Sequence, residues 1–147
     1  MFSETDKKFM QQAIALAKQA ETIDEVPIGA ILVLDNKVIG EGFNSPISDN
    51  DPTSHAEINA IRDAAQNLKN YRLVNTTLYV TLEPCTMCIG AIVNSRINRV
   101  VYAAKDDKYG ALATLKDFNF NHKVVFEGGL LKDECSIMLS KFFKNKR

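Results

Sequence analysis

The sequence of 147 residues contains no run of about 18 apolar residues, so we expect no helix that spans a bilayer. Its N-terminal segment, Met1 to Lys8, carries acidic residues and lacks the apolar centre of a secretory signal. Three cysteines are an odd number, which does not suit a disulfide framework. These absences predict a protein of a reducing compartment, the cytoplasm, with no membrane partner.

The sequence also lacks an excess of charge, because 18 lysines and arginines balance 18 aspartates and glutamates. It therefore has no strong overall positive field, and any nucleic-acid partner must be recognised at a local site. With 46% apolar residues the chain can bury one core, and no repeat, low-complexity tract or linker divides it. We expect a single domain over residues 1–147.

Hydrophobic patterning predicts helices and strands in alternation. Short runs of β-branched and aromatic residues between turn residues indicate strands, and apolar residues three or four apart indicate amphipathic helices. The expected strands are 28–34, 38–44, 78–82, 100–103 and 124–126. Helices are expected from a cap at Ser3 or Thr5 to about Ala20, over 52–68 and 84–93, and along a last stretch whose apolar stripe runs from Cys135 to Phe143 before a basic C-terminal end. Residues 106–122 are expected to be mostly loop with one short helix. Interleaved strands and helices favour an α/β fold with helices on both faces of a sheet.

Two separated motifs, Ser54-His55-Ala56-Glu57 and Glu83-Pro84-Cys85-Thr86-Met87-Cys88, contain side chains that zinc prefers. Both are expected near the starts of helices, since Pro52 and Pro84 suit a first helical position. His55, Cys85 and Cys88 then supply three nitrogen and sulfur ligands of a tetrahedral ion, and no fourth protein ligand is evident. Water would fill the open position, where zinc lowers its pKa from 15.7 to about 7.

Other interpretations of these motifs stay open on the residues alone. A closed structural zinc site normally shows paired Cys-x-x-Cys units or a second nearby histidine, and a thioredoxin-like redox pair would leave His55 and Glu57 without a role. Glu57 lies two residues from His55 and could carry protons to and from a bound water. The alternative for Glu57 is an ordinary solvated glutamate in a first helical turn.

His55-Ala56-Glu57 and Pro84-Cys85-Thr86-Met87-Cys88 match the H-x-E and P-C-x-x-C signature of zinc-dependent nucleobase deaminases. The flanking stretches, among them Glu25-Val26-Pro27-Ile28-Gly29-Ala30 and Tyr71-Arg72-Leu73, further resemble the bacterial tRNA-specific adenosine deaminases, and the similarity extends to Phe143. The resemblance implies a cytidine-deaminase-like fold, a three-layer α/β/α sandwich with a central five-stranded mixed sheet. It also implies one zinc ion per subunit, a homodimer and no organic cofactor.

The activity that the resemblance implies is hydrolysis of the wobble adenosine to inosine in the anticodon stem-loop of an arginine tRNA with an ACG anticodon. Glu57 would take a proton from the zinc-bound water as hydroxide attacks C6 of adenine, and would then protonate the departing ammonia. Substrate contacts are expected at Asn44, Ala56, Asp106 and Asn121. Asn44 has the alternative of an ordinary strand-end residue.

Three further features have simpler explanations. His122 could contact RNA, but a lone histidine in a loop is more often exposed without a role. The basic end of the last helix is either a solvated face or a contact for tRNA phosphates, and Cys135 is expected to be a core residue. Two rival functions remain, namely deamination of a free base or nucleotide such as guanine or cytosine, and a non-enzymatic RNA-binding module stabilised by zinc.

Overall fold

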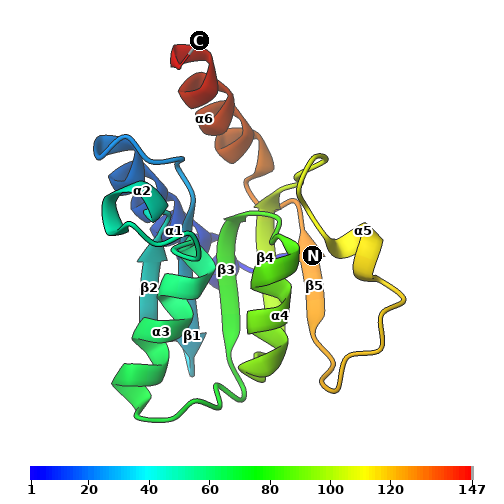
Figure 1. The fold of residues 1–147 in the computed structure, drawn as a ribbon. Helices are drawn as coiled ribbons and strands as arrows, with labels where there is room; N and C mark the ends of the chain where they lie inside the picture. The colour runs from blue at the N-terminus through cyan, green and yellow to red at the C-terminus, as the bar shows by residue number, and fades with distance from the viewer. Residues whose placement is uncertain (147) are drawn as a thin grey trace.

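The computed structural model describes residues 1–146, in which five strands form one mixed sheet between helices (Figure 1). The strand order is β2-β1-β3-β4-β5, with β1 antiparallel to both neighbours and with β3, β4 and β5 parallel. The strands are β1 (Gly29–Leu34), β2 (Lys37–Phe43), β3 (Thr77–Leu82), β4 (Arg99–Ala104) and β5 (Val125–Gly128). All five expected strands are confirmed, although β5 begins one residue later than expected and continues to Gly128.

Helices cover both faces of this sheet, which confirms the three-layer α/β/α architecture. On one face α1 and α6 pack against Ile31, Tyr79 and Val101. On the other face α3 and α4 pack against Leu32 and Val80. The helices are α1 (Glu4–Thr22), α2 (Pro46–Asp49), α3 (Ala56–Leu68), α4 (Thr86–Asn94), α5 (Leu112–Leu115) and α6 (Lys132–Asn145).

Helix α3 lies unusually close to β2 because both surfaces carry small residues. A Cβ atom built on Gly42 would lie 2.4 Å from the carbonyl oxygen of Ala56, and one built on Gly40 would lie 2.4 Å from that of Ala60. No real Cβ approaches an oxygen so closely, so glycine is required at both positions. This packing places the first turn of α3 beside the end of β2.

The last helix, α6, extends beyond the sheet (Figure 1). Cys135 and Phe142 are buried, which confirms the core position expected for Cys135, but Phe143 is 47% exposed. The expected apolar stripe is therefore only partly buried, because the C-terminal half of α6 has passed the edge of the sheet. Within residues 1–146, no helix combines the length and apolar character needed to cross a membrane.

A charged network joins the start of α1 to the sheet. The Asp6 carboxylate accepts hydrogen bonds from Tyr79 Oη at 2.7 Å and from Arg99 Nη1 and Nη2 at 2.9 and 3.1 Å. The Arg99 guanidinium, helped by Tyr79, holds the pKa of Asp6 well below its ordinary value of 3.8. Because folding favours the ionised form of Asp6, this carboxylate stabilises the folded protein at neutral pH. The stabilisation is lost as the pH falls through the pKa of Asp6 in the folded state.

Replacement Asp6→Asn should therefore lower the free energy of unfolding by about 2 kcal/mol at pH 7, the size expected for hydrogen bonds to a charged group. The difference from the wild type should shrink below about pH 4, because the Asp6 carboxyl of the unfolded wild-type chain then takes up a proton while the folded one stays ionised. Urea unfolding at pH 7 and pH 3 measures both values. Asp107→Asn, at an exposed position, is the control, and an equal loss at both pH values would contradict the assignment.

Candidate metal and catalytic site

The two metal-ligand motifs occupy the caps of α3 and α4. His55 is the N-cap of α3 and Cys85 the N-cap of α4, both with extended backbone (ψ 155° and 174°). The expected helix starts at Pro52 and Pro84 are wrong. Asp51 Oδ1 accepts the backbone N–H and the hydroxyl of Thr53, at 2.9 and 2.8 Å, and this closes a separate turn before α3. The helix α2 also lies within a stretch expected to be loop.

His55, Cys85 and Cys88 present their ligand atoms to one another, all within 4.8 Å. The Sγ atoms of Cys85 and Cys88 each lie 3.6 Å from His55 Nδ1. A tetrahedral ion with Zn–S of about 2.3 Å and Zn–N of about 2.0 Å would separate sulfur from nitrogen by about 3.5 Å. The observed spacing therefore fits a zinc ion, with a fourth position left for a non-protein ligand.

The electrostatics of the cluster favour the thiolate at Cys85 and the thiol at Cys88. The hydrogen bond from Cys88 and, to a smaller extent, the one with His55 lower the pKa of Cys85 to about 4. The bond to Cys85 and burial raise the pKa of Cys88, while the hydrogen bond with Cys85 raises that of His55. A divalent cation would deprotonate Cys88 as well, because a coordinated thiol binds as the thiolate.

Glu57 is the second residue of α3 and is only 4% exposed. Burial, followed by the charge of Cys85, raises its pKa to about 7, and its carboxyl also interacts with Cys88. The interpretation as a solvated surface glutamate is therefore wrong. A carboxyl with a pKa near neutrality, beside three metal-ligand atoms, can both accept and donate a proton.

Glu83, the first residue of the second motif, holds a loop. Its carboxylate is 5% exposed and accepts the N–H groups of Asp106 and Leu112 at 3.2 and 3.1 Å. A Cβ on Gly110 would lie 2.4 Å from this carboxylate, and Ala111 donates its N–H to Pro84. The loop 105–111 is thereby fixed against the segment that carries Cys85. A single glutamate in the sequence does not indicate such a contact.

Three of the expected substrate contacts are linked to the segments that carry the metal ligands. Ala56 directly follows His55, Asp106 bonds to Glu83, and Asn44 precedes Ser45, whose N–H donates to the carbonyl of Ser54. Asn44 is 6% exposed and directly follows β2, and Ala56, adjacent to His55, is fully buried in the core. Asp106 is tied to Glu83 and uses its own side chain to accept the N–H groups of Lys108 and Tyr109.

The fourth expected contact, Asn121, lies beside the opposite end of α4, where its Oδ1 accepts from Arg96 Nη1 at 3.4 Å. The structure thus does not bring Asn121 to the cluster. The next residue, His122, is half-buried and bonds the carbonyl of Ile97 through Nε2 at 2.8 Å, so its expected exposure without a partner is wrong.

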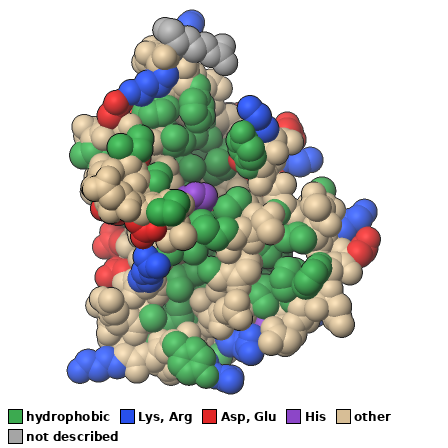
Figure 2. Space-filling view, in the orientation of Figure 1, with side chains coloured by type: hydrophobic (Ala, Val, Ile, Leu, Met, Phe, Trp, Pro, Cys, Tyr) green, Lys and Arg blue, Asp and Glu red, His purple; other side chains and the backbone are tan. Residues whose placement is uncertain are grey.

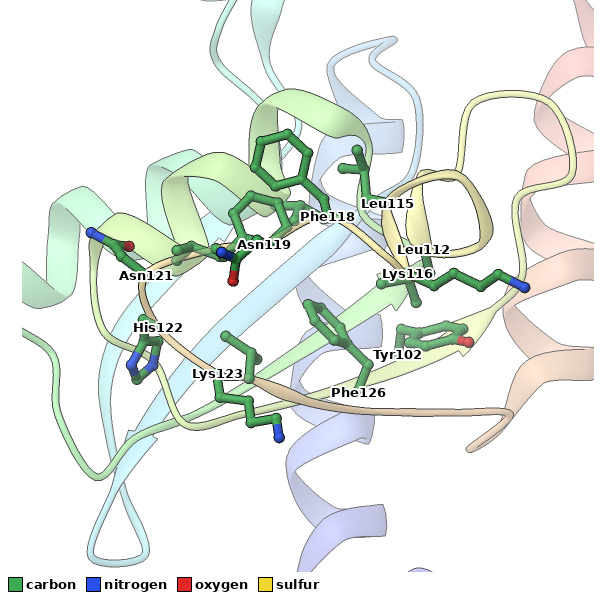
Figure 3. Close-up of a pocket in the computed structure, with 14 residues that line it drawn as sticks. Tyr102, Leu112, Leu115, Lys116, Phe118, Asn119, Asn121, His122, Lys123 and Phe126 are labelled. Atoms are coloured by element: carbon green, nitrogen blue, oxygen red, sulfur yellow. The ribbon is translucent and has the colours of Figure 1, made fainter.

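A cavity of about 730 Å³ lies between α4, the sheet and the segment that follows α5 (Figure 3). Tyr102 and Phe126 line it from the sheet, Phe118 from the opposite segment, and Lys116 and Lys123 stand near its edge. Its lining includes none of the three metal-ligand residues and not Glu57. The cavity is therefore separate from the metal-ligand residues, although it reaches Ile89, which directly follows Cys88.

The family model of the cytidine and deoxycytidylate deaminase zinc-binding region matches residues 3–104. The chain belongs to this deaminase family. Membership confirms the expected zinc enzyme and contradicts the thioredoxin-like interpretation of the Cys-x-x-Cys motif. It also agrees with the arrangement of ligand atoms described above.

Within this family the chain is similar to proteins named tRNA-specific adenosine deaminase. That of Haemophilus influenzae is 51% identical over 99% of this chain and 87% of the relative, and that of Bacillus subtilis is 43% identical over 97% and 91%. A structure from a study of A-to-I editing by tRNA:A34 deaminases superposes with a TM-score of 0.86, at 43% identity over 90% of this chain and 99% of the other.

A more distant structure, the guanine deaminase of Nitrosomonas europaea, has a TM-score of 0.77 at 21% identity and covers 97% of this chain and 85% of the other. At this identity the likeness shows the fold alone, and it confirms the cytidine-deaminase-like architecture.

Proposed function

We propose that the chain is a zinc-dependent tRNA adenosine deaminase that converts the wobble adenosine of an ACG anticodon, in an arginine tRNA, to inosine. The observation that carries the chemistry is the buried Glu57 carboxyl beside a His-Cys-Cys group that leaves one metal position free. The choice of adenosine in tRNA rests on the names of the relatives at 41–52% identity.

In this proposal His55, Cys85 and Cys88 would hold the zinc. The ion would act as a Lewis acid and would lower the pKa of a bound water to about 7. Glu57 accepts a proton from the attacking water and delivers a proton to N1 of adenine. The same carboxylate then takes the proton of the hydroxyl now on C6 and passes it to the amino group, which leaves as ammonia while C6 becomes the carbonyl carbon of inosine. Burial, which raises the pKa of Glu57 above its ordinary value, favours proton exchange by this carboxyl.

Substrate recognition is proposed at Asn44, Ala56, Asp106 and Asn121. Because Asn121 lies at the far end of α4 from Cys85, a ligand that touches both must be larger than one nucleoside. An anticodon stem-loop meets this condition, and a free base does not. The lysines Lys141 and Lys144 near the end of α6 are exposed and available to phosphates.

We further propose a cytoplasmic homodimer with one zinc per subunit, each subunit folding as a single domain. Hydrophobic side chains gather on the face that includes α4 and α5 (Figure 2). Among them Met87 is 37% exposed and Phe118 is 61% exposed. Apolar surface of this kind is typical of protein interfaces, and sedimentation equilibrium of the zinc-loaded protein measures the subunit number.

The deciding experiment incubates the zinc-loaded protein with an ACG-anticodon stem-loop and analyses the digested nucleosides. We expect inosine from this RNA, and none from a matched stem-loop in which guanosine replaces the wobble adenosine. Free adenosine, guanine and cytosine should remain unchanged. Turnover of a free base instead would favour the rival deaminase, and RNA binding without any deamination would favour the non-enzymatic module.

A further inference from the structure

A hydrogen-bonded group of four side chains lies behind the start of α3; we name Ser45, Asp49, Ser54 and Asn59 the Asp49 cluster. Asp49 Oδ2 accepts both the Ser45 and the Ser54 hydroxyl at 2.6 Å. The two hydroxyl oxygens are 3.1 Å apart, and the serines are only 6% and 1% exposed. One oxygen of an otherwise exposed carboxylate thus binds two buried donors, which also lower the pKa of Asp49.

Asn59, on the first turns of α3, completes the cluster. Its Nδ2 donates to the Phe43 carbonyl at 2.9 Å and to Ser54 Oγ at 3.0 Å. The backbone N–H of Ser45 donates to the Ser54 carbonyl at 3.0 Å. The cluster therefore joins three elements, namely the end of β2, the helix α2 and the residue before the cap of α3.

The neighbours of these serines are the proposed functional residues. Ser45 directly follows Asn44, and Ser54 directly precedes His55. Neither the Asn44 amide nor the His55 ring takes part in the bonds of the cluster, so both remain available to ligands. We propose that Asp49 is a positioning residue which, through Ser45 and Ser54, fixes the substrate-binding end of β2 relative to the metal-binding start of α3.

This inference rests on the proposed function, because it assigns Asn44 to the substrate. Replacement Asp49→Ala leaves two buried hydroxyls without their charged acceptor, and the segment 43–55 should loosen. His55 still caps α3, and the cysteines lie on α4, so zinc should remain at one per chain. We expect KM for the stem-loop to rise about tenfold with kcat changed less than about threefold.

The direction of the KM change distinguishes a positioning role of Asp49 from an effect of its negative charge on RNA binding. Removal of a negative charge near a polyanion site should tighten RNA binding and lower KM. Asp107→Ala removes an exposed carboxylate from the loop 105–111 and gives the size of that effect. Asp49→Asn keeps one acceptor oxygen and should fall between wild type and Asp49→Ala, whereas a lowered KM in both Asp49 variants would overturn the proposal.

A mutant cycle tests the route through the serines. If Asp49 acts through Ser45 and Ser54, Asp49→Ala should add less than about twofold to KM in the Ser45→Ala/Ser54→Ala background. Full additivity in that background would contradict the proposal. The cycle is interpretable even where each variant loses some thermal stability, because it compares KM values at a temperature at which all variants are folded.

Hydrogen exchange provides a readout that does not depend on activity. Backbone amides of residues 43–55 should exchange at least about tenfold faster in Asp49→Ala, with those of β3 unchanged. Unchanged exchange in 43–55 would overturn the positioning role. If the wild-type chain made no inosine, the proposed function would fail by itself, while the exchange result would still decide whether Asp49 holds this segment.

Discussion

Glu57→Gln should reduce the rate of inosine formation about 10²- to 10⁴-fold while the protein retains one zinc per chain. Glutamine fills the same buried space and keeps a hydrogen-bonding oxygen, but it cannot take up or release the proton that hydrolysis requires. Single-turnover assays with the stem-loop measure the rate, and atomic absorption measures the zinc. The substituted protein should still bind the RNA, since the change removes only proton transfer.

Glu21→Gln is the matched control, because Glu21 is an exposed residue on α1. It should leave both the rate and the zinc content unchanged. Full turnover in Glu57→Gln would refute the proton-carrier role. Loss of zinc together with activity would instead identify Glu57 as part of the metal-binding set.

Cys88→Ala should lower zinc below a tenth of an ion per chain and decrease deamination on the order of 10⁴-fold or more. Cys88 is fully buried and supplies one of the three ligand atoms that residues 1–146 bring together. Without the metal, the attacking water would revert from a pKa of about 7 to one of 15.7. Zinc analysis after dialysis and the stem-loop assay measure the two quantities.

Thermal unfolding provides an independent check on Cys88. A chelator should lower the melting temperature of the wild type, because zinc bound only to the folded chain stabilises it, but it should hardly affect Cys88→Ala. Cys135→Ala removes the other buried thiol, which lies in the core on α6, and should keep full zinc. Stoichiometric zinc in Cys88→Ala would refute the assigned ligand set.

The sequence was sufficient for features that depend on local patterning. The expected strands 28–34 and 38–44 are the two arms of the β1–β2 hairpin, and Asp35 and Asn36 between them adopt the positive φ that such a short turn requires. The metal residues followed from their types and spacing. The helix starts did not, because Asp51 binds Thr53 in a turn of its own and leaves the cap of α3 to His55.

Contacts between distant segments were beyond the sequence. Nothing in the order of residues shows that Glu83 would hold the loop 105–111, or that Asn59 would reach back to Phe43. The His122 bond to Ile97 is of the same kind. In each case the partner is distant in the sequence and is brought near by the tertiary fold, so the residue type alone leaves its role open.

The close fit between β2 and α3 has a consequence for how the enzyme can change. Gly42 faces the backbone of Ala56, which joins His55 to Glu57, so an added carbon there would displace the metal ligand and the proton carrier together. The positions of His55 and Glu57 thus depend on residue 42 of β2 having no side-chain carbon. We expect substitutions that change substrate preference in loops such as 105–111. Gly40, Gly42 and the alanines of α3 that they contact are expected to stay unchanged.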